Sequence, residues 1–201
     1  MSISIAPLHP ADVDQLVDLH RRAFPKFFLS QLGPAFLTQF YRGFLTDPTS
    51  ITAVARDDSG RVVGSVVGTT SPAGFFGRLL RRRMAGFVLA SAQAAIADPR
   101  RTPRLLRGVA YRGQAGTAVD GALLSSICVD PALQGHGVGR TLITAWSHTA
   151  RSRGADLAFL TTDAHDNDAT NAFYLQSGWR CADTFTTAEG RMMNRYEKEL
   201  G

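Results

Sequence analysis

Three glycines on alternate positions lie about two-thirds of the way along the chain. Residues 129–140 read VDPALQGHGVGR, which places them at 135, 137 and 139. Such a loop brings backbone N–H groups together at the start of a helix without Cβ atoms in the way, and the helix dipole there favours an anion. The spacing predicts a diphosphate site. A tight strand-to-helix turn is the alternative, and the G-x-G-x-x-G pattern of a Rossmann loop is not matched.

A second group of polar and aromatic residues follows the glycine loop. It comprises Asn167, Phe173, Tyr174, Gly178 and Trp179. Taken alone, Asn167 is typical of a helix N-cap, and Phe173 with Tyr174 is typical of an aromatic pair in a core. These residues therefore indicate chemistry only in combination with the loop.

Together the two motifs resemble those of the GNAT acetyltransferase superfamily. The first is V-x-P-x-x-Q-G-x-G-x-G over 129–139, and the second is N-x-x-x-x-x-F-Y-x-x-x-G-W over 167–179. The resemblance implies an N-acetyltransferase that takes its acyl group from acetyl-CoA. It also implies an α/β fold in which a mixed, mostly antiparallel sheet is flanked by helices and its central parallel pair of strands splays apart.

The resemblance further implies roles for individual residues. Ile127 and Val129 match the strand edge that pairs with the pantetheine arm of coenzyme A, and Asn167 matches a position that bonds this arm. Tyr174 matches the phenol that protonates the departing thiolate, for which a side-chain pKa of about 10 is suitable. The residues that match the cradle of the pyrophosphate are Gln134, Gly135, Gly137, Val138, Gly139 and Arg140.

The base that would deprotonate the amine has more than one candidate. Family members often carry a glutamate on the strand before the loop, whereas residues 121–129 read GALLSSICV and offer only Ser125 and Ser126. The candidates are Asp163 and His165, just past the next strand, or an ordered water. The alternative is a solvated loop that only caps the following helix.

The cysteines are not expected to do chemistry. Cys128 could form an acyl intermediate beside a thioester, but it has no partner in sequence and is predicted to be a small buried apolar residue. With Cys181 it could form at most one bridge, so reduced thiols are expected. Cysteine and histidine residues show no metal-ligand spacing, and no metal is predicted.

Apolar periodicity and turn residues predict the elements that position these groups. The order strand, helix, strand, helix between Leu123 and Gln176 predicts a parallel pair within a mixed sheet. The predicted strands are 4–8, 51–56, 61–69, 123–129, 157–162, 180–186 and 191–199. The predicted helices are 10–20, 34–47, 75–97, 104–109, 139–152 and 169–176.

Composition limits the class of protein. The chain has 201 residues, 44% of them hydrophobic and 19% charged, which indicates one globular domain over 1–201. The longest weakly polar run, 84–97, is shorter than the roughly 20 residues of a membrane span. The first residues lack the basic start and apolar stretch of a secretory signal, so a cytoplasmic protein is expected.

Positive charge is concentrated in residues 71–118, here called the basic insertion, which hold nine arginines and one acid, Asp98. It is expected to be helical. In the fold that the resemblance implies, a short turn normally joins the strands at 61–69 and 123–129, and here the basic insertion lies between them. It could bind an acidic acceptor, lie on an anionic membrane, or contact nucleic acid. No nucleic-acid motif accompanies it, so no nucleic-acid partner is predicted. The alternative is an added helical layer with solvated arginines.

The acceptor is predicted from a less specific resemblance. Residues 23–41 are similar to those of GNAT members encoded with sugar and surface-polysaccharide enzymes. This favours a small-molecule primary amine such as an amino sugar or nucleotide amino sugar. A protein or peptide N-acetyltransferase and a non-catalytic CoA-binding module are the alternatives, and both a monomer and a homodimer remain open.

Overall fold

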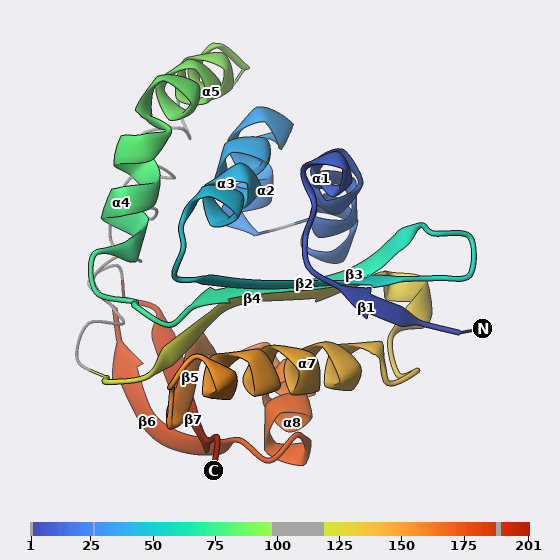
Figure 1. Ribbon diagram of the computed structural model, residues 1–201. Coiled ribbons are helices and arrows are strands. Elements are labelled where there is room, and N and C mark those ends of the chain that lie inside the picture. The colour runs from blue at the N-terminus through green and yellow to red at the C-terminus, as the bar shows by residue number, and fades with distance from the viewer. Residues whose placement is uncertain (1, 26, 98–118, 188–189) are drawn as a thin grey trace.

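A seven-stranded mixed sheet runs through the middle of the computed structural model, which describes residues 2–25, 27–97, 119–187 and 190–201 (Figure 1). Its spatial order is β1-β2-β3-β4-β5-β7-β6, and every neighbouring pair is antiparallel except β4 with β5. This confirms the predicted mixed sheet with one parallel pair. The strands are β1 (Ser4–Ala6), β2 (Ser50–Arg56), β3 (Val62–Thr69), β4 (Ala122–Val129), β5 (Leu157–Asp163), β6 (Arg180–Thr186) and β7 (Met192–Glu199).

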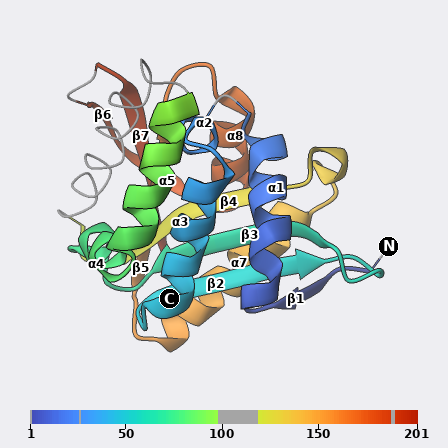
Figure 2. The ribbon, with the colours of Figure 1, turned by 90° about the horizontal axis from the view of Figure 1, so that it is seen from above.

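Helices cover both faces of the sheet. The helices α1, α2 and α3 lie over one face with α4 and α5 beside them, while α7 and α8 lie on the other (Figures 1 and 2). The helices are α1 (Val13–Ala23), α2 (Phe28–Gln31), α3 (Pro34–Thr46), α4 (Phe75–Arg82), α5 (Met84–Ala97), α7 (Val138–Ser152) and α8 (Asp168–Gln176), with short 3-10 turns at Pro10–Asp12 and Pro131–Leu133. None of these described helices has the length and apolar character needed to cross a membrane.

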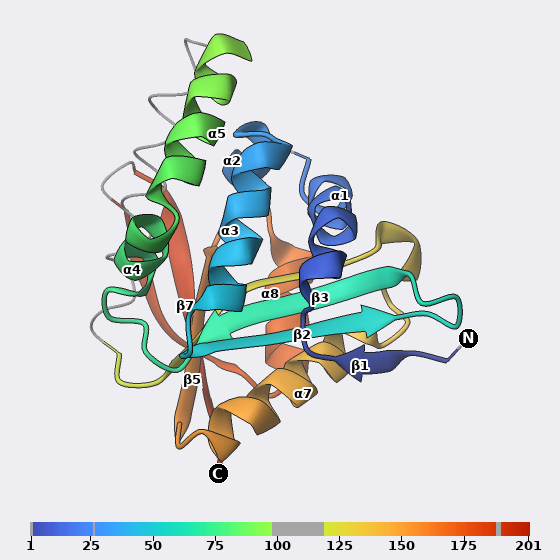
Figure 3. The same cartoon turned by 45° about the horizontal axis from the view of Figure 1, so that its top comes forward.

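The basic insertion begins with two helices rather than the single one predicted over 75–97. The backbone of Arg83 leaves the helical region, with φ −123° and ψ 24°, so α4 ends there and α5 starts in a new direction (Figure 3). The helix predicted over 104–109 lies outside the described residues.

Each face of the sheet has its own core. Buried side chains of α1 and α3 form one with β2 and β3, and buried side chains of α7 form the other with β3 and β4. Gly68 on β3 allows the second core to close, because a Cβ there would lie 2.6 Å from the Trp146 ring and would also meet the Leu123 carbonyl. Trp146 is fully buried as a result.

The parallel pair separates soon after it begins. Only Ala122 with Ala158 and Leu123 with Phe159 are paired between β4 and β5, although both strands continue for several residues. Beyond these pairs each strand is held only on its outer side, β4 by β3 and β5 by β7. The splay predicted from the family resemblance is therefore present, and it opens the sheet at its centre.

A buried carboxylate anchors α4 to the rest of the fold. Asp47, at the end of α3, accepts hydrogen bonds from the backbone N–H and hydroxyl of Thr49 and forms ion pairs with Arg78 and Arg82 at 3.3 and 3.1 Å. Burial alone would raise the pKa of Asp47, but the hydrogen bonds from Thr49 and Arg78 outweigh it and hold the pKa below its ordinary 3.8.

Asp47→Ala is expected to lower the free energy of unfolding by about 2 kcal/mol at pH 7, because it removes charged hydrogen bonds at a buried site. Since the folded-state pKa is depressed, this contribution is present above the unfolded-state value and is lost as the pH falls through the folded-state value. Urea unfolding at pH 7 and below pH 4 measures both effects. Asp18→Ala, at an exposed position on α1, is the control, and equal losses from the two variants would contradict the anchoring role.

Candidate active site

A cavity of about 910 Å³ lies where β4 and β5 separate. Its walls come from both sides of the sheet: the loop before α7, β4, β5 and α8 form one half, and α1 through α5 form the other. All but one of the twelve site residues predicted from the sequence line this cavity. The eleven are Ile127, Val129, Gln134, Gly135, Gly137, Val138, Gly139, Arg140, Asp163, Asn167 and Tyr174.

The glycine loop has the geometry of an anion site. Gly135 and Gly137 have φ of 81° and 82°, a region that side chains disfavour, and a Cβ on either would meet no atom within 4 Å. The loop is thus open on its outer side, and Gly137 is the N-cap of α7 with no side chain over the helix end. Free backbone N–H groups and the α7 dipole suit a diphosphate there.

Gly139 is needed for helix packing and not for access to the loop. A Cβ at this position would lie 3.1 Å from Cζ of Phe173, so the absence of a side chain lets the start of α7 lie against α8. Ile127 and Val129 of β4 are half-buried and pack against the α7 core, on the same side as the loop. The strand edge and the loop therefore form one continuous wall.

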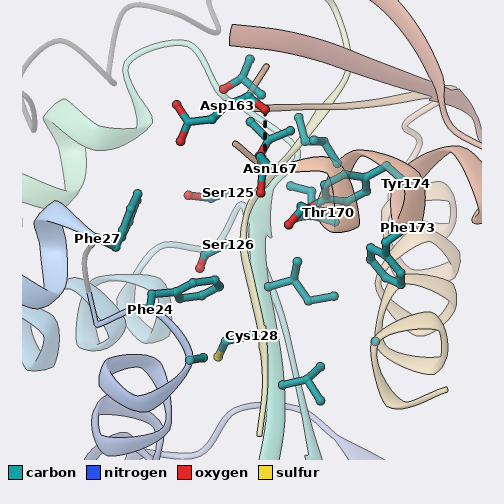
Figure 4. Close-up of a pocket in the computed structure, with 18 of the residues that line it drawn as sticks. Phe24, Phe27, Ser125, Ser126, Cys128, Asp163, Asn167, Thr170, Phe173 and Tyr174 are labelled. Carbon is teal, nitrogen blue, oxygen red and sulfur yellow. Dashed lines mark hydrogen bonds between the residues drawn. The ribbon is translucent and has the colours of Figure 1, made fainter. Parts of the chain in front are cut away.

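Asn167 joins β5 to α8 through its side chain. Its Nδ2 donates to the Thr162 hydroxyl at 2.8 Å and to the Asp163 carbonyl at 3.1 Å. It occupies the N-cap position of α8, but its side chain makes no capping hydrogen bond, unlike the N-cap role that its residue type suggests. The Asp163 carbonyl also accepts from Asn171, so two amides fix the strand-to-helix junction beside the cavity (Figure 4).

Tyr174 is a neutral phenol on the α8 side of the cavity (Figure 4). Its residue is 5% exposed, and its ring packs against Trp179 and Tyr196 with centroids 6.0 and 5.6 Å away. Burial, and secondarily the nearby Tyr196, raises the pKa of Tyr174 well above its ordinary value. The hydroxyl therefore stays protonated near neutral pH and can donate a proton to a strong base.

The two candidate bases differ in position. Asp163 lines the cavity mouth at the end of β5, and both of its oxygens accept hydrogen bonds from Arg191, at 2.5 and 2.7 Å. Its side chain is 42% exposed, so water reaches the carboxylate. His165 is exposed and does not line the cavity. The structure therefore brings Asp163 to the site and leaves His165 outside it.

A bulge in β4 gives the strand a polar face toward the other half of the cavity. Val67 pairs with Ser126 and Gly68 with Leu124, so Ser125 is an extra residue in the ladder. As a result the side chains of Ser125 and Ser126 both point toward Phe24 and Phe27, as does Cys128 (Figure 4). Strand alternation alone would have placed the two serines on opposite faces.

Cys128 is buried and also lines the cavity. Burial raises the pKa of its thiol to about 12, despite an interaction with the Tyr41 hydroxyl that lowers it. The thiolate is the reactive form, so this cysteine is poorly suited to nucleophilic attack. The prediction that it is a small buried residue agrees with its surroundings.

Sequence reasoning missed the aromatic residues of the second half. They come from the segment between α1 and α2 and from α3, α4 and α5, and are Phe24, Phe27, Phe36, Phe40, Phe76 and Phe87. The many phenylalanines between residues 24 and 44 could have indicated an aromatic cavity wall, but their helical periodicity is equally typical of core residues. Four arginines of the basic insertion are described, Arg78, Arg81, Arg82 and Arg83, and none of them is among the described lining residues. The other five lie outside the described residues.

Comparison with known proteins assigns the chain to a family. Residues 13–179 match the acetyltransferase (GNAT) family. The chain therefore belongs to this family of acyltransferases, which use acetyl-CoA. A search of curated proteins found no match. Among the described residues, no group of histidine, cysteine, aspartate or glutamate side chains could hold a metal ion.

Solved structures share the fold at low sequence identity. The ribosomal-protein-S18-alanine N-acetyltransferase from Escherichia coli is 16% identical with a TM-score of 0.59, covering 100% of this chain and 95% of that one. The PaiA N-acetyltransferase from Thermoplasma acidophilum, in complex with coenzyme A, is 14% identical with a TM-score of 0.60 and 99% coverage of both chains. An aminoglycoside 6'-N-acetyltransferase complexed with coenzyme A is 17% identical with a TM-score of 0.61, covering 98% and 97%.

The residues present fit acetyl-CoA. The open loop at Gly135 and Gly137 offers backbone donors to a diphosphate, and the unpaired edge of β4 offers backbone groups to an extended amide-containing arm. The neutral Tyr174 phenol lies in the same cavity, where it can donate a proton to the coenzyme A sulfur.

Gly137→Val is expected to weaken coenzyme A binding by about tenfold or more, because a β-branched side chain in the left-handed region costs about 1–2 kcal/mol and covers the anion site. Isothermal titration calorimetry with coenzyme A measures the change. Gly154→Val is the matched control, since Gly154 also has a positive φ, 86°, and an open Cβ position but follows the opposite end of α7. Wild-type affinity in the Gly137 variant would refute the loop as the diphosphate site.

Proposed function

We propose that this protein transfers an acetyl group from acetyl-CoA to the primary amine of a small molecule, by direct attack with both substrates bound. One observation carries the proposal: a single cavity contains the anion loop, the free edge of β4 and the Tyr174 phenol, and continues to the opposite face of the sheet. Donor and acceptor can therefore enter from opposite sides and meet at the splay. No residue of the cavity is needed as a covalent carrier.

The chain's own groups account for the proton movements. Acetyl-CoA, when bound, supplies the acetyl thioester that a neutral amine attacks. The C–N bond forms, the C–S bond breaks, and the amine loses one proton while the sulfur gains one. Tyr174 donates to the sulfur, and Asp163, the one carboxylate among the described lining residues, takes the amine proton through water at the cavity mouth. Solvent then returns Asp163 and Tyr174 to their starting states.

The size and enclosure of the acceptor half support a small molecule over a protein. Helices α1, α3, α4 and α5 enclose this half, and the lining side chains include buried rings such as Phe36 and Phe87. An amino sugar, the acceptor predicted from residues 23–41, stays within this class. A non-catalytic CoA-binding module would have no use for a buried phenol in the cavity.

Tyr174→Phe is expected to lower kcat by about 10²-fold, the size of a general-acid contribution. The variant keeps the ring that packs against Trp179 and Tyr196, so stability and coenzyme A affinity should not change. Thiol release from acetyl-CoA, followed with any amine that is turned over, gives kcat. An unchanged kcat would remove Tyr174 from the proton-transfer scheme.

Asp163→Asn is expected to lower kcat/KM for the amine by about 10²-fold, because the amide cannot take a proton. Arg191→Gln breaks the same ion pair but leaves the carboxylate, so this variant should remain active. His165→Ala, at the exposed position, should also remain active. Equal losses in the Asp163 and Arg191 variants would mean that the pair is structural and that the base lies elsewhere.

A further inference from the structure

We infer that the amine acceptor carries an apolar body, an aryl or alkyl group, and that residues of α1 through α5 bind this body while β4 holds the amine. The inference rests on the proposed function and names its substrate class. It is carried by the chemistry of the acceptor half of the cavity, which is unlike that of a site for a hydroxylated or phosphorylated ligand.

The wall opposite β4 is almost wholly hydrocarbon. Six phenylalanines form it together with Leu29, Leu79 and Leu80. The rings support one another: Phe36 lies 4.9 Å from Phe87 between centroids, and Phe24 lies 6.0 Å from Phe27. The side chains described in this wall are preformed and offer no hydrogen bond to a sugar hydroxyl. Ligand hydroxyls facing it would lose water without replacement.

In the described part of the chain, positive charge also lies in the wrong place to bind a phosphorylated acceptor. Of the described lining residues, only Arg140 and Asp163 are charged, and they belong to the glycine loop and to the end of β5. Three of the four described arginines of the basic insertion have partners outside the cavity: Arg78 and Arg82 pair with Asp47, and the Arg83 guanidinium donates to the Gln39 side chain at 2.8 Å. The described part of the basic insertion therefore contributes its apolar side to the cavity, through Phe76 and Leu80.

One polar strip sets the direction in which the acceptor lies. The Ser125 and Ser126 hydroxyls face Phe24 and Phe27 across the cavity, and these are the polar side chains of β4 on that side (Figure 4). An amine nitrogen placed at the serines finds hydrogen-bond acceptors next to the splayed strands. Its substituent then extends into the aromatic wall. The neutral amine is also favoured there, since a low-polarity site opposes an ammonium ion.

A graded series of acceptors tests this inference. Ethylamine, butylamine and hexylamine, with acetyl-CoA, are expected to show kcat/KM rising roughly fourfold for each added methylene, as burial of a CH₂ predicts. 2-Phenylethylamine should exceed glucosamine and spermidine. Preference for glucosamine or a nucleotide amino sugar, with no gain along the alkyl series, would overturn the inference while leaving the acetyltransferase function intact.

A second experiment tests whether the aromatic wall binds the acceptor or the acyl chain of the donor. Acetyl-CoA and hexanoyl-CoA are compared with butylamine as the fixed acceptor. Acetyl-CoA should be the better donor if the aromatic wall holds the acceptor. Faster transfer from hexanoyl-CoA would assign the wall to the acyl chain and would overturn the inference.

Binding without turnover provides an independent readout. N-hexylacetamide should bind the protein in calorimetry, and Leu80→Asn should weaken that binding about tenfold or more, because it places an amide in the apolar wall. Val88→Asn is the control, because Val88 on α5 is 63% exposed and does not line the cavity. If coenzyme A does not bind but the amide does, the proposed function fails and the apolar site remains. If the amide binds equally to both variants, the site is not where we place it.

Discussion

The unpaired edges of β4 and β5 are the constraint on which the rest of the structure depends. Backbone N–H and C=O groups inside a protein normally have partners, and a gap in the middle of a sheet removes them. The gap persists because each strand is firmly held on its outer side, β4 along β3 and β5 along β7. The opening is thereby a stable feature of the fold, and an extended amide-containing ligand can fill it.

Buried polar contacts fix the helices on each side of the cavity relative to the central strands. On one side, Nδ1 of His20 lies 2.6 Å from the Tyr41 hydroxyl, which also interacts with Ser126 and Cys128 of β4. This connects α1, α3 and the central strand inside an otherwise apolar layer. On the other side, Asn167 ties β5 to the helix that bears Tyr174. Directional bonds fix positions that hydrophobic packing alone leaves free.

The two sequence motifs were enough to predict residues that share one wall of the cavity, because most of them lie close together in sequence. The glycine loop, the strand before it and the start of the helix after it all lie within residues 123–140. The parallel pairing of β4 with β5 was predicted from the order of strands and helices. The acceptor half depends on contacts between distant segments. Phe27 and Phe76 are far apart in sequence and line the same cavity only because the chain folds. Sequence periodicity cannot distinguish a ring that lines a cavity from a ring in the core.

Three other features of the structure could not be predicted from residue type. The extra residue Ser125 in β4 follows from its register with β3, and the helix break at Arg83 interrupts an unbroken helical pattern. The Asn167 side chain turns to β5 instead of capping its helix. In β4 and at Asn167, a contact with a neighbouring strand overrides a local preference, which a single sequence does not reveal.

Under the proposed function, different stretches of the chain bind the donor and the acceptor, and β4 lies between them. Residues 23–40 and 76–87 supply the aromatic wall, whereas residues 127–176 supply the anion loop and Tyr174. Ser126 and Cys128 face one compartment while Ile127 and Val129 pack toward the other. Under the proposed function, substitutions in residues 23–40 and 76–87 would change the acceptor side of β4 and leave the glycine loop and Tyr174 on its other side as they are.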